Sequence, residues 1–214
     1  MKPVATVALA LALACSAAVA VPPQPTEKAD VLSLRGNLEQ GKEAYEVCSA
    51  CHLANGMGRL DGSMPVVAGQ YTKVLVKQMA DIRAGHRDNP TMFPFARDMT
   101  PQDIADTAAY MHSLKWLTDN GKGPGKNLKQ GEELYKKNCQ SCHGARGEGD
   151  EAKFIPRLAG QHYKHMLRQI AEMREGKRKN ADKDMLKVIK PYSDADTEAV
   201  SDYLSRLTVA ATGK

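Results

Sequence analysis

The feature that most constrains this 214-residue chain is a pentapeptide of the form C-x-x-C-H that occurs twice, at 48–52 and at 139–143. This spacing is typical of covalent attachment of a c-type haem, because two thiols reach the two vinyl groups of one porphyrin and the adjacent imidazole faces the iron. A lone C-x-x-C could instead be a redox disulfide or half of a zinc site. The histidine that directly follows each C-x-x-C, and the occurrence of the whole motif twice, favour haem attachment over those alternatives. We therefore expect two covalently bound haem c groups, with these attachment and iron-binding residues: Cys48, Cys51, His52, Cys139, Cys142 and His143.

The haem motifs belong to a longer internal repeat. The spacing of 91 residues between positions 48 and 139 also pairs these residues: Pro65 with Pro156, Gln70 with Gln161, Gln78 with Gln169, and Arg87 with Arg178. The second copy then gains two residues, and Asp103 matches Asp196. A glycine-rich segment, 119–127, lies between the copies and predicts a linker. We expect one domain at 37–118 and a second at 128–210.

Helical periodicity runs through both copies. Segments 37–50 and 127–141 each predict a helix that ends at a haem motif, and segment 71–84 has apolar residues at helical spacing. Thr100 and Ser193 each predict the N-cap of a last helix, with an acid three residues later. We found no alternating strand pattern of useful length. The expected fold class is all-α, with two domains in tandem that each enclose one haem.

The N-terminal segment predicts export. Residues 1–20 combine Lys2, a short apolar run and an A-x-A ending, which is typical of a secretory signal peptide. The apolar run is short for a membrane span. Retention as an anchor, or lipid attachment at Cys15, stays open as an alternative. The proline-rich residues that follow, 21–36, predict a flexible lead-in.

Composition and charge set further limits. Aromatic residues are only 5% of the chain, and two haem groups would add the apolar surface that such a core lacks. The net charge of +5 would fall close to zero once four haem propionates are counted. The basic balance therefore does not indicate nucleic acid binding, and we expect at most peripheral membrane association.

The second axial ligand of each iron decides the function. The histidines outside the motifs lack a histidine at the equivalent position and are expected at surface or edge positions: His86, His112, His162 and His165. Met92 and Met185 are the best candidates, because each lies in a polar loop eight residues before the N-cap of a last helix. Met64, near the first haem motif, leaves an alternative to Met92 open. A His and a Met would close the iron coordination and favour electron transfer over catalysis.

Together, these motifs resemble those of the di-haem cytochrome c4 family, in which two cytochrome c-like domains follow in tandem. The resemblance covers essentially the whole chain after residue 20. It rests on the two C-x-x-C-H motifs and on these segments: 67–70, 83–87 and Met92 in the first copy, and 156–161, 174–178 and Met185 in the second. It implies that His52 and Met92 bind one iron and that His143 and Met185 bind the other. One departure is Val66, which stands where the second copy has Arg157, so a haem contact by that arginine applies to one domain only.

The resemblance also implies a function. It predicts a periplasmic, non-enzymatic electron carrier of a respiratory chain, with the quinol-oxidising cytochrome bc complex as donor and a terminal oxidase as acceptor. An alternative is the cytochrome subunit of a dehydrogenase such as flavocytochrome c sulfide dehydrogenase. A third class, a di-haem peroxidase or thiosulfate-oxidising enzyme, would require an iron with an open or unusual ligand. Four arginines recur in both copies and either pair with propionates or end a helix in solvent: Arg83, Arg87, Arg174 and Arg178.

Overall fold

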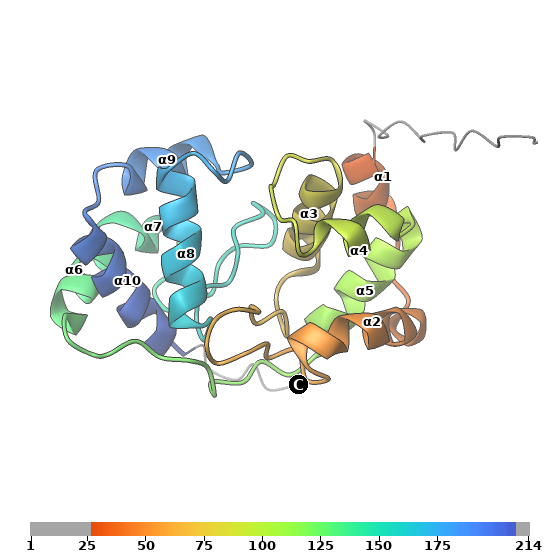
Figure 1. The fold of residues 1–214 in the computed structure, drawn as a ribbon, viewed down its shortest axis with the longest axis horizontal. Helices are drawn as coiled ribbons and strands as arrows, with labels where there is room; N and C mark the ends of the chain where they lie inside the picture. The colour runs from red at the N-terminus through yellow and green to blue at the C-terminus, as the bar shows by residue number, and fades with distance from the viewer. Residues whose placement is uncertain (1–26, 209–214) are drawn as a thin grey trace, which may run out of the picture.

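The computed structural model describes residues 27–208, and within that range the chain is helical, with one isolated antiparallel bridge between Asp150 and Ile155. The helices of the first repeat are α1 (Glu27–Ser33), α2 (Leu38–His52), α3 (Thr72–Arg83), α4 (Phe93–Asp98) and α5 (Pro101–Ser113). Those of the second are α6 (Leu128–Asn138), α7 (Gln140–His143), α8 (Tyr163–Arg174), α9 (Lys183–Ile189) and α10 (Asp194–Arg206). The two sets form two units side by side (Figure 1). The predicted all-α fold is therefore confirmed.

Each unit is built on a close crossing of its first long helix with its last. α2 crosses α5 at Gly41, and α6 crosses α10 at Gly131. A Cβ atom at Gly41 would clash with the backbone oxygen of Asp106, and one at Gly131 would clash with that of Ala199. The two glycines thus allow backbone-to-backbone contact at equivalent places in the two repeats.

One turn beyond each crossing, a pair of tyrosine rings joins the same helices. The ring centroids of Tyr45 and Tyr110 lie 5.3 Å apart, and those of Tyr135 and Tyr203 lie 5.7 Å apart. The second repeat has one more residue between this tyrosine and its haem motif. The extra residue breaks the helix, because α6 ends at Asn138 and the turn α7 follows after Cys139. The single helix predicted at 127–141 is therefore two helices.

The last helix of each repeat begins as predicted. The Thr100 and Ser193 side chains accept hydrogen bonds from the backbone N–H groups of Asp103 and Asp196. Each aspartate carboxylate in turn accepts a hydrogen bond from the backbone N–H of the N-cap residue, which completes a capping box.

Two segments have more regular structure than the sequence suggested. Residues 27–33, inside the predicted lead-in, form α1, and the Val31 side chain is buried in the first core with only 1% of its surface exposed. The predicted methionine loops contain short helices, with Met92 at the N-cap of α4 and Met185 within α9. Apolar residues in short polar segments explain both differences, because their burial stabilises helices too short to be predicted from periodicity.

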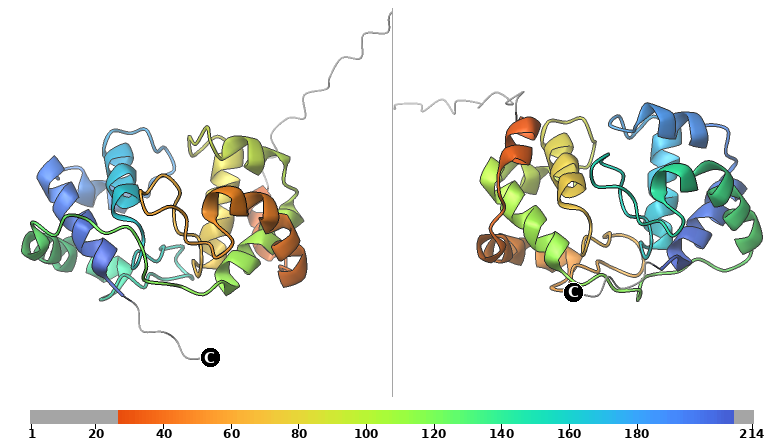
Figure 2. Two further views of the ribbon diagram at one scale, coloured as in Figure 1. Left: turned by 60° about the horizontal axis from the view of Figure 1, so that its bottom comes forward. Right: turned by 180° about the vertical axis from the view of Figure 1, so that it is seen from behind.

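The two units meet through the loops that follow the haem motifs (Figure 2). The Gln70 side chain accepts from the backbone N–H of Arg157 at 3.0 Å and donates to its carbonyl at 3.0 Å. The Gln161 side chain makes the same pair with Val66, at 2.9 Å each. Since Gln70 matches Gln161 and Val66 matches Arg157, these bonds relate the repeats by an approximate two-fold axis.

The predicted linker is hydrogen-bonded to the second unit, and through His162 to the first. Its Asn120 side chain donates to the backbone oxygens of Gln161 and Ser205, at 2.9 and 2.8 Å. The Gly121 N–H donates to the ring of His162 at 2.9 Å, and the other ring nitrogen lies 2.7 Å from the Met57 carbonyl of the first repeat. His162 has no exposed surface, so the expectation of a surface position is wrong for this residue.

Within residues 27–208, none of the helices combines the length and the apolar content needed to cross a bilayer. The predicted signal peptide at 1–20, with Cys15, lies outside the described residues.

Candidate haem sites

The two motif histidines are held in the same way. The His52 Nδ1 atom lies 3.0 Å from the carbonyl oxygen of Pro65, and the His143 Nδ1 atom lies 3.2 Å from that of Pro156. A carbonyl oxygen only accepts, so each Nδ1 carries the proton and donates it. The lone pair of each ring is therefore on Nε2. This arrangement fixes the tautomer and the ring orientation that a metal-binding histidine requires.

Burial keeps both rings neutral. Only 5% of His52 and 8% of His143 is exposed. Burial lowers the pKa of both imidazoles below the usual value, and the hydrogen bonds to Pro65 and Pro156 oppose this effect. A neutral imidazole is the form that binds a metal ion.

In each repeat, a glycine holds the loop between the motif histidine and Pro65 or Pro156 against the haem motif. The backbone N–H groups of Gly58 and Gly149 donate to the carbonyls of His52 and His143, both at 2.9 Å. Both glycines have a positive φ, +64° and +74°. A Cβ atom at Gly58 would clash with the Met64 carbonyl, so the close approach of the loop needs glycine. These glycines were not predicted, although their equal spacing after the motifs is visible in the sequence.

The four motif thiols favour haem over the alternatives left open by the sequence. None of them forms a disulfide. Burial raises the pKa of Cys48 and Cys139 to about 11, which disfavours the thiolate that zinc and redox sites need. Among residues 27–208, no group of three or more His, Cys, Asp or Glu side chains is arranged to hold a metal ion. The donor set of each motif, two thiols and one oriented imidazole, fits a covalent haem.

The two candidate methionines are positioned by equivalent side chains. The Met92 N–H donates to the Asn89 side chain at 3.1 Å, and the Met185 N–H donates to the Asp182 side chain at 3.1 Å. Met185 packs against the apolar cluster that contains Cys139. Cys48 packs against the corresponding cluster of the first repeat, which does not include Met92. Met185 therefore shares an apolar cluster with a cysteine of its motif, and Met92 does not.

Two buried donors at the domain junction point to a carboxylate ligand. The Arg157 guanidinium lies 4.7 Å from the Tyr71 ring centroid and 5.1 Å from that of Trp116, and its Nη1 donates to the Gly69 carbonyl at 2.6 Å. Its Nε atom and the Trp116 Nε1 atom are both buried without a hydrogen-bond partner among the described residues. Unpaired buried donors are costly, and a haem propionate could accept from both. The first repeat has Val66 in place of Arg157 and lacks this donor.

The other recurring arginines have distinct partners. Arg83 donates to the Met99 carbonyl, and Arg174 donates to Asp194 at 3.0 Å and Thr197 at 3.2 Å within its own repeat. Arg87 and Arg178 are half-buried and bond across the domain junction, so neither is a solvated helix end.

Comparison with a protein-family model agrees with the repeated geometry. The model described as "Cytochrome c" matches the chain twice, at residues 38–115 and 128–208.

Known proteins are similar to most of the chain. The chain is 33% identical to "Cytochrome c4" of Pseudomonas aeruginosa over 80% of its own length and 89% of the relative. It is 28% identical to "Thiosulfate dehydrogenase electron acceptor" of Stutzerimonas stutzeri, over 86% of its own length and 94% of the relative. The crystal structure of reduced cytochrome c4 from Pseudomonas stutzeri superposes with a TM-score of 0.72 and 31% identity, covering 81% of this chain and 100% of that one.

Proposed function

The chain belongs to the di-haem cytochrome c4 family and carries two covalently bound haem c groups. We propose that a histidine and a methionine are the two axial ligands of each haem iron. In the first repeat, Cys48 and Cys51 form the thioethers, and His52 and Met92 are the axial ligands. The observation that carries this proposal is the clamp between each motif histidine and a proline carbonyl.

The second repeat is assigned in the same way. Cys139 and Cys142 form the thioethers, and His143 and Met185 are the axial ligands. When bound, the haem supplies an iron that exchanges one electron. The residues of this chain hold the imidazole at a fixed angle, keep it neutral and enclose it away from water. A His/Met pair raises the potential relative to two histidines, which suits a carrier at the high-potential end of an electron-transfer chain.

The proposed physiological role is transfer in the periplasm from the quinol-oxidising cytochrome bc complex to a terminal oxidase. The similarity to cytochrome c4 along most of the chain supports an electron carrier. The proposal assigns the chain no catalytic step of its own.

The ligand assignment is tested by absorption spectroscopy of the oxidised protein. Ferric haem with a bound methionine sulfur has a weak long-wavelength charge-transfer band. We expect Met92→Ala and Met185→Ala each to remove about half of that band. Met99→Leu is the matched control, because Met99 packs against the same apolar cluster as Cys48 but is assigned no ligand role, and it should keep the full band. A full band in Met92→Ala, or a halved band in the control, would reject the assignment for the first repeat.

A second candidate function is that of electron acceptor for a dehydrogenase. The relative named as a thiosulfate dehydrogenase electron acceptor, which the chain covers almost completely, favours it. Reduction of the oxidised protein by a cytochrome bc complex with quinol should be compared with reduction by thiosulfate dehydrogenase with thiosulfate. Rapid reduction by the bc complex alone supports the first role, and rapid reduction by the dehydrogenase alone supports the second.

A further inference from the structure

Four side chains close a ring across the junction between the repeats. The Arg87 guanidinium donates to the side-chain oxygens of Gln78, at 2.7 Å, and Gln169, at 2.8 Å. The Arg178 guanidinium donates to the same two oxygens, at 3.1 Å for Gln78 and 2.8 Å for Gln169. Each arginine therefore bridges both repeats, and each glutamine accepts from both. We call these four residues the Arg–Gln ring.

The Arg–Gln ring follows the approximate two-fold axis of the molecule. Gln78 and Gln169 occupy equivalent positions in the repeat, and so do Arg87 and Arg178. A guanidinium presents its donors in a fixed planar fork, so two such forks across one pair of acceptors define an angle as well as a distance. The ring thus restrains how one repeat is rotated relative to the other.

The ring also places two positive charges at the boundary. Burial lowers the pKa of Arg87 and Arg178, and the charge of Arg178 adds to this effect at Arg87, while Glu172 and Asp81 oppose it at both. An arginine stays protonated in proteins, so both charges persist. Asp81 belongs to the first repeat and Glu172 to the second, so each repeat contributes one acid near the ring.

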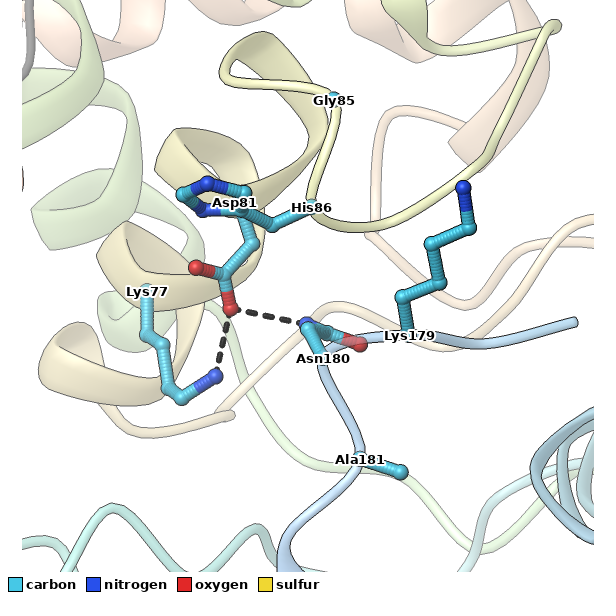
Figure 3. A pocket seen from close by; sticks show the side chains of 7 residues that line it. All are labelled: Lys77, Asp81, Gly85, His86, Lys179, Asn180 and Ala181. Carbon is cyan, nitrogen blue, oxygen red and sulfur yellow. Dashed lines mark hydrogen bonds and ion pairs between the residues drawn. The ribbon is translucent and has the colours of Figure 1, made fainter. Parts of the chain in front are cut away.

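Further hydrogen bonds join the ring to two acids, buried Asp81 and partly exposed Glu172. Arg178 Nε donates to the Asn180 side chain at 3.0 Å, and Asn180 donates to Asp81 of the other repeat at 2.7 Å. Lys77 reaches the same carboxylate at 2.5 Å, and both contacts lie in a cleft of about 530 Å³ between the repeats (Figure 3). On the other side, Gln169 donates to Glu172 at 2.6 Å.

From this geometry we infer that Arg87 and Arg178 are positioning residues for electron exchange between the two haem groups, an inference that rests on the proposed function. Exchange depends steeply on the separation of the two haems and on the difference between their potentials. The ring acts on both quantities, because it fixes the two repeats relative to each other and shares its charges between them.

The charges of Arg87 and Arg178 distinguish a role in electron exchange from a role that only holds the two repeats together. A nearby positive charge favours the reduced haem, which carries one positive charge fewer than the oxidised form. Arg87 belongs to the first repeat but bonds to Gln169 of the second. Removal of the Arg87 charge is therefore expected to lower the midpoint potentials of both haems, whereas an arginine within one repeat would affect mainly its own.

The experiment compares Arg87→Gln and Arg178→Gln with Arg174→Gln in the full-length protein with both haems. Arg174 is the matched control, because its partners Asp194 and Thr197 lie in its own repeat. Both midpoint potentials are measured, with the exchange rate between the haems in half-reduced protein by NMR. We expect either ring variant to lower both midpoints and to slow exchange several-fold. The control should leave the exchange rate and the first midpoint unchanged.

A charge-retaining variant separates geometry from charge. Arg178→Lys keeps the positive charge but loses the planar fork, so we expect both midpoints to stay close to those of the unaltered protein while exchange slows. The inference is overturned if Arg87→Gln shifts only the first midpoint, or if exchange is unchanged in both glutamine variants. The methionine charge-transfer band is recorded throughout. Its absence from the unaltered protein would reject the proposed ligation instead, which keeps the two failures distinct.

Discussion

In the first repeat, the helix that carries the haem motif runs unbroken from Leu38 to His52, whereas in the second it stops at Asn138 and a separate turn presents His143. Both histidines nevertheless meet a proline carbonyl with the same ring nitrogen. The comparison shows which geometry each unit holds fixed. The glycine at the helix crossing and the hydrogen bond from the motif histidine to a proline carbonyl are the same in both repeats. The one extra residue of the second repeat lies between these two features, where the helix breaks at Cys139.

The helices that carry the candidate methionines differ in what they expose. Phe93 and Phe95 of α4 are 40% and 43% exposed. At the corresponding places of α9, Leu186 and Val188 pack against the second core. The repeats are therefore similar around the motif histidine and different on the surface beside the methionine.

The largest expected effect comes from removal of one haem at a time. Cys48→Ala with Cys51→Ala should give protein with a single haem, in the second repeat, and Cys139→Ala with Cys142→Ala should give the reverse. The unfilled repeat should lose ordered structure, because the chain is poor in aromatic residues and the haem supplies much of its apolar core. Mass spectrometry and haem absorption measure this outcome. If both haems were lost from either variant, the repeats would not be separate units.

The helix crossings provide a comparison at matched positions. Gly41→Ala and Gly131→Ala should each destabilise their repeat by about 1–3 kcal/mol, because the added methyl group would collide with backbone oxygen. Denaturant unfolding measures the effect, and exposed Glu43→Ala on α2 is the control, expected within about 0.5 kcal/mol. A large loss at Gly41 with a small one at Gly131 would show that the helix break has loosened the second crossing.

An asymmetric pH dependence is expected at His162, which stands where the first repeat has Tyr71. The ring accepts from Gly121 and donates to Met57, so it binds as the neutral form. Burial lowers its pKa below the ordinary value of 6.5, against the opposing hydrogen bond to Met57 and the charge of Asp61. The unfolded chain thus takes up the proton first as the pH falls. Stability is full above 6.5 and declines as the pH falls toward the pKa of the folded state.

His162→Gln tests this dependence, because an amide can also accept and donate. Unfolding of the variant, followed between pH 5 and 8, should show a smaller acid-side decline than the unaltered protein, because the contribution of His162 is lost while those of the other buried histidines stay. An equal decline in both proteins would assign the effect to other groups.

The smallest expected effect concerns the N-caps of the last helices. Thr100→Ala and Ser193→Ala should each cost about 1 kcal/mol, because each removes the acceptor for one backbone N–H at the helix start. Thermal unfolding of the two variants should show equal losses. Unequal losses would indicate that one terminal helix is held more by its packing than by its cap.

Much of the fold followed from local signals in the sequence. The haem motifs, the two N-caps and the helical periodicity are each encoded within a few neighbouring residues, and the predicted helical fold and haem cofactor are confirmed, except that the helix predicted at 127–141 is broken. The prediction that Met92 and Met185 bind iron is not decided by the protein atoms alone, and it stays a prediction.

The features that were not predicted depend on contacts distant in sequence. The helix break at Cys139 follows only when Tyr135 and His143 are both known to be fixed by other elements. α1 is too short to predict from periodicity, and it forms because Val31 is buried against the first core. The buried position of His162 depends on Met57 and Gly121, which lie far away in the chain.

The paired bonds of Gln70 and Gln161 have a consequence for how the two halves can diverge. Each glutamine recognises the main chain of the opposite repeat, at Val66 or Arg157, and not its side chain. Any residue with a backbone N–H can occupy the recognised position without loss of the join. A duplicated gene could therefore place valine on one side and arginine on the other. The two halves gained freedom to become chemically unlike while they stayed assembled as one molecule.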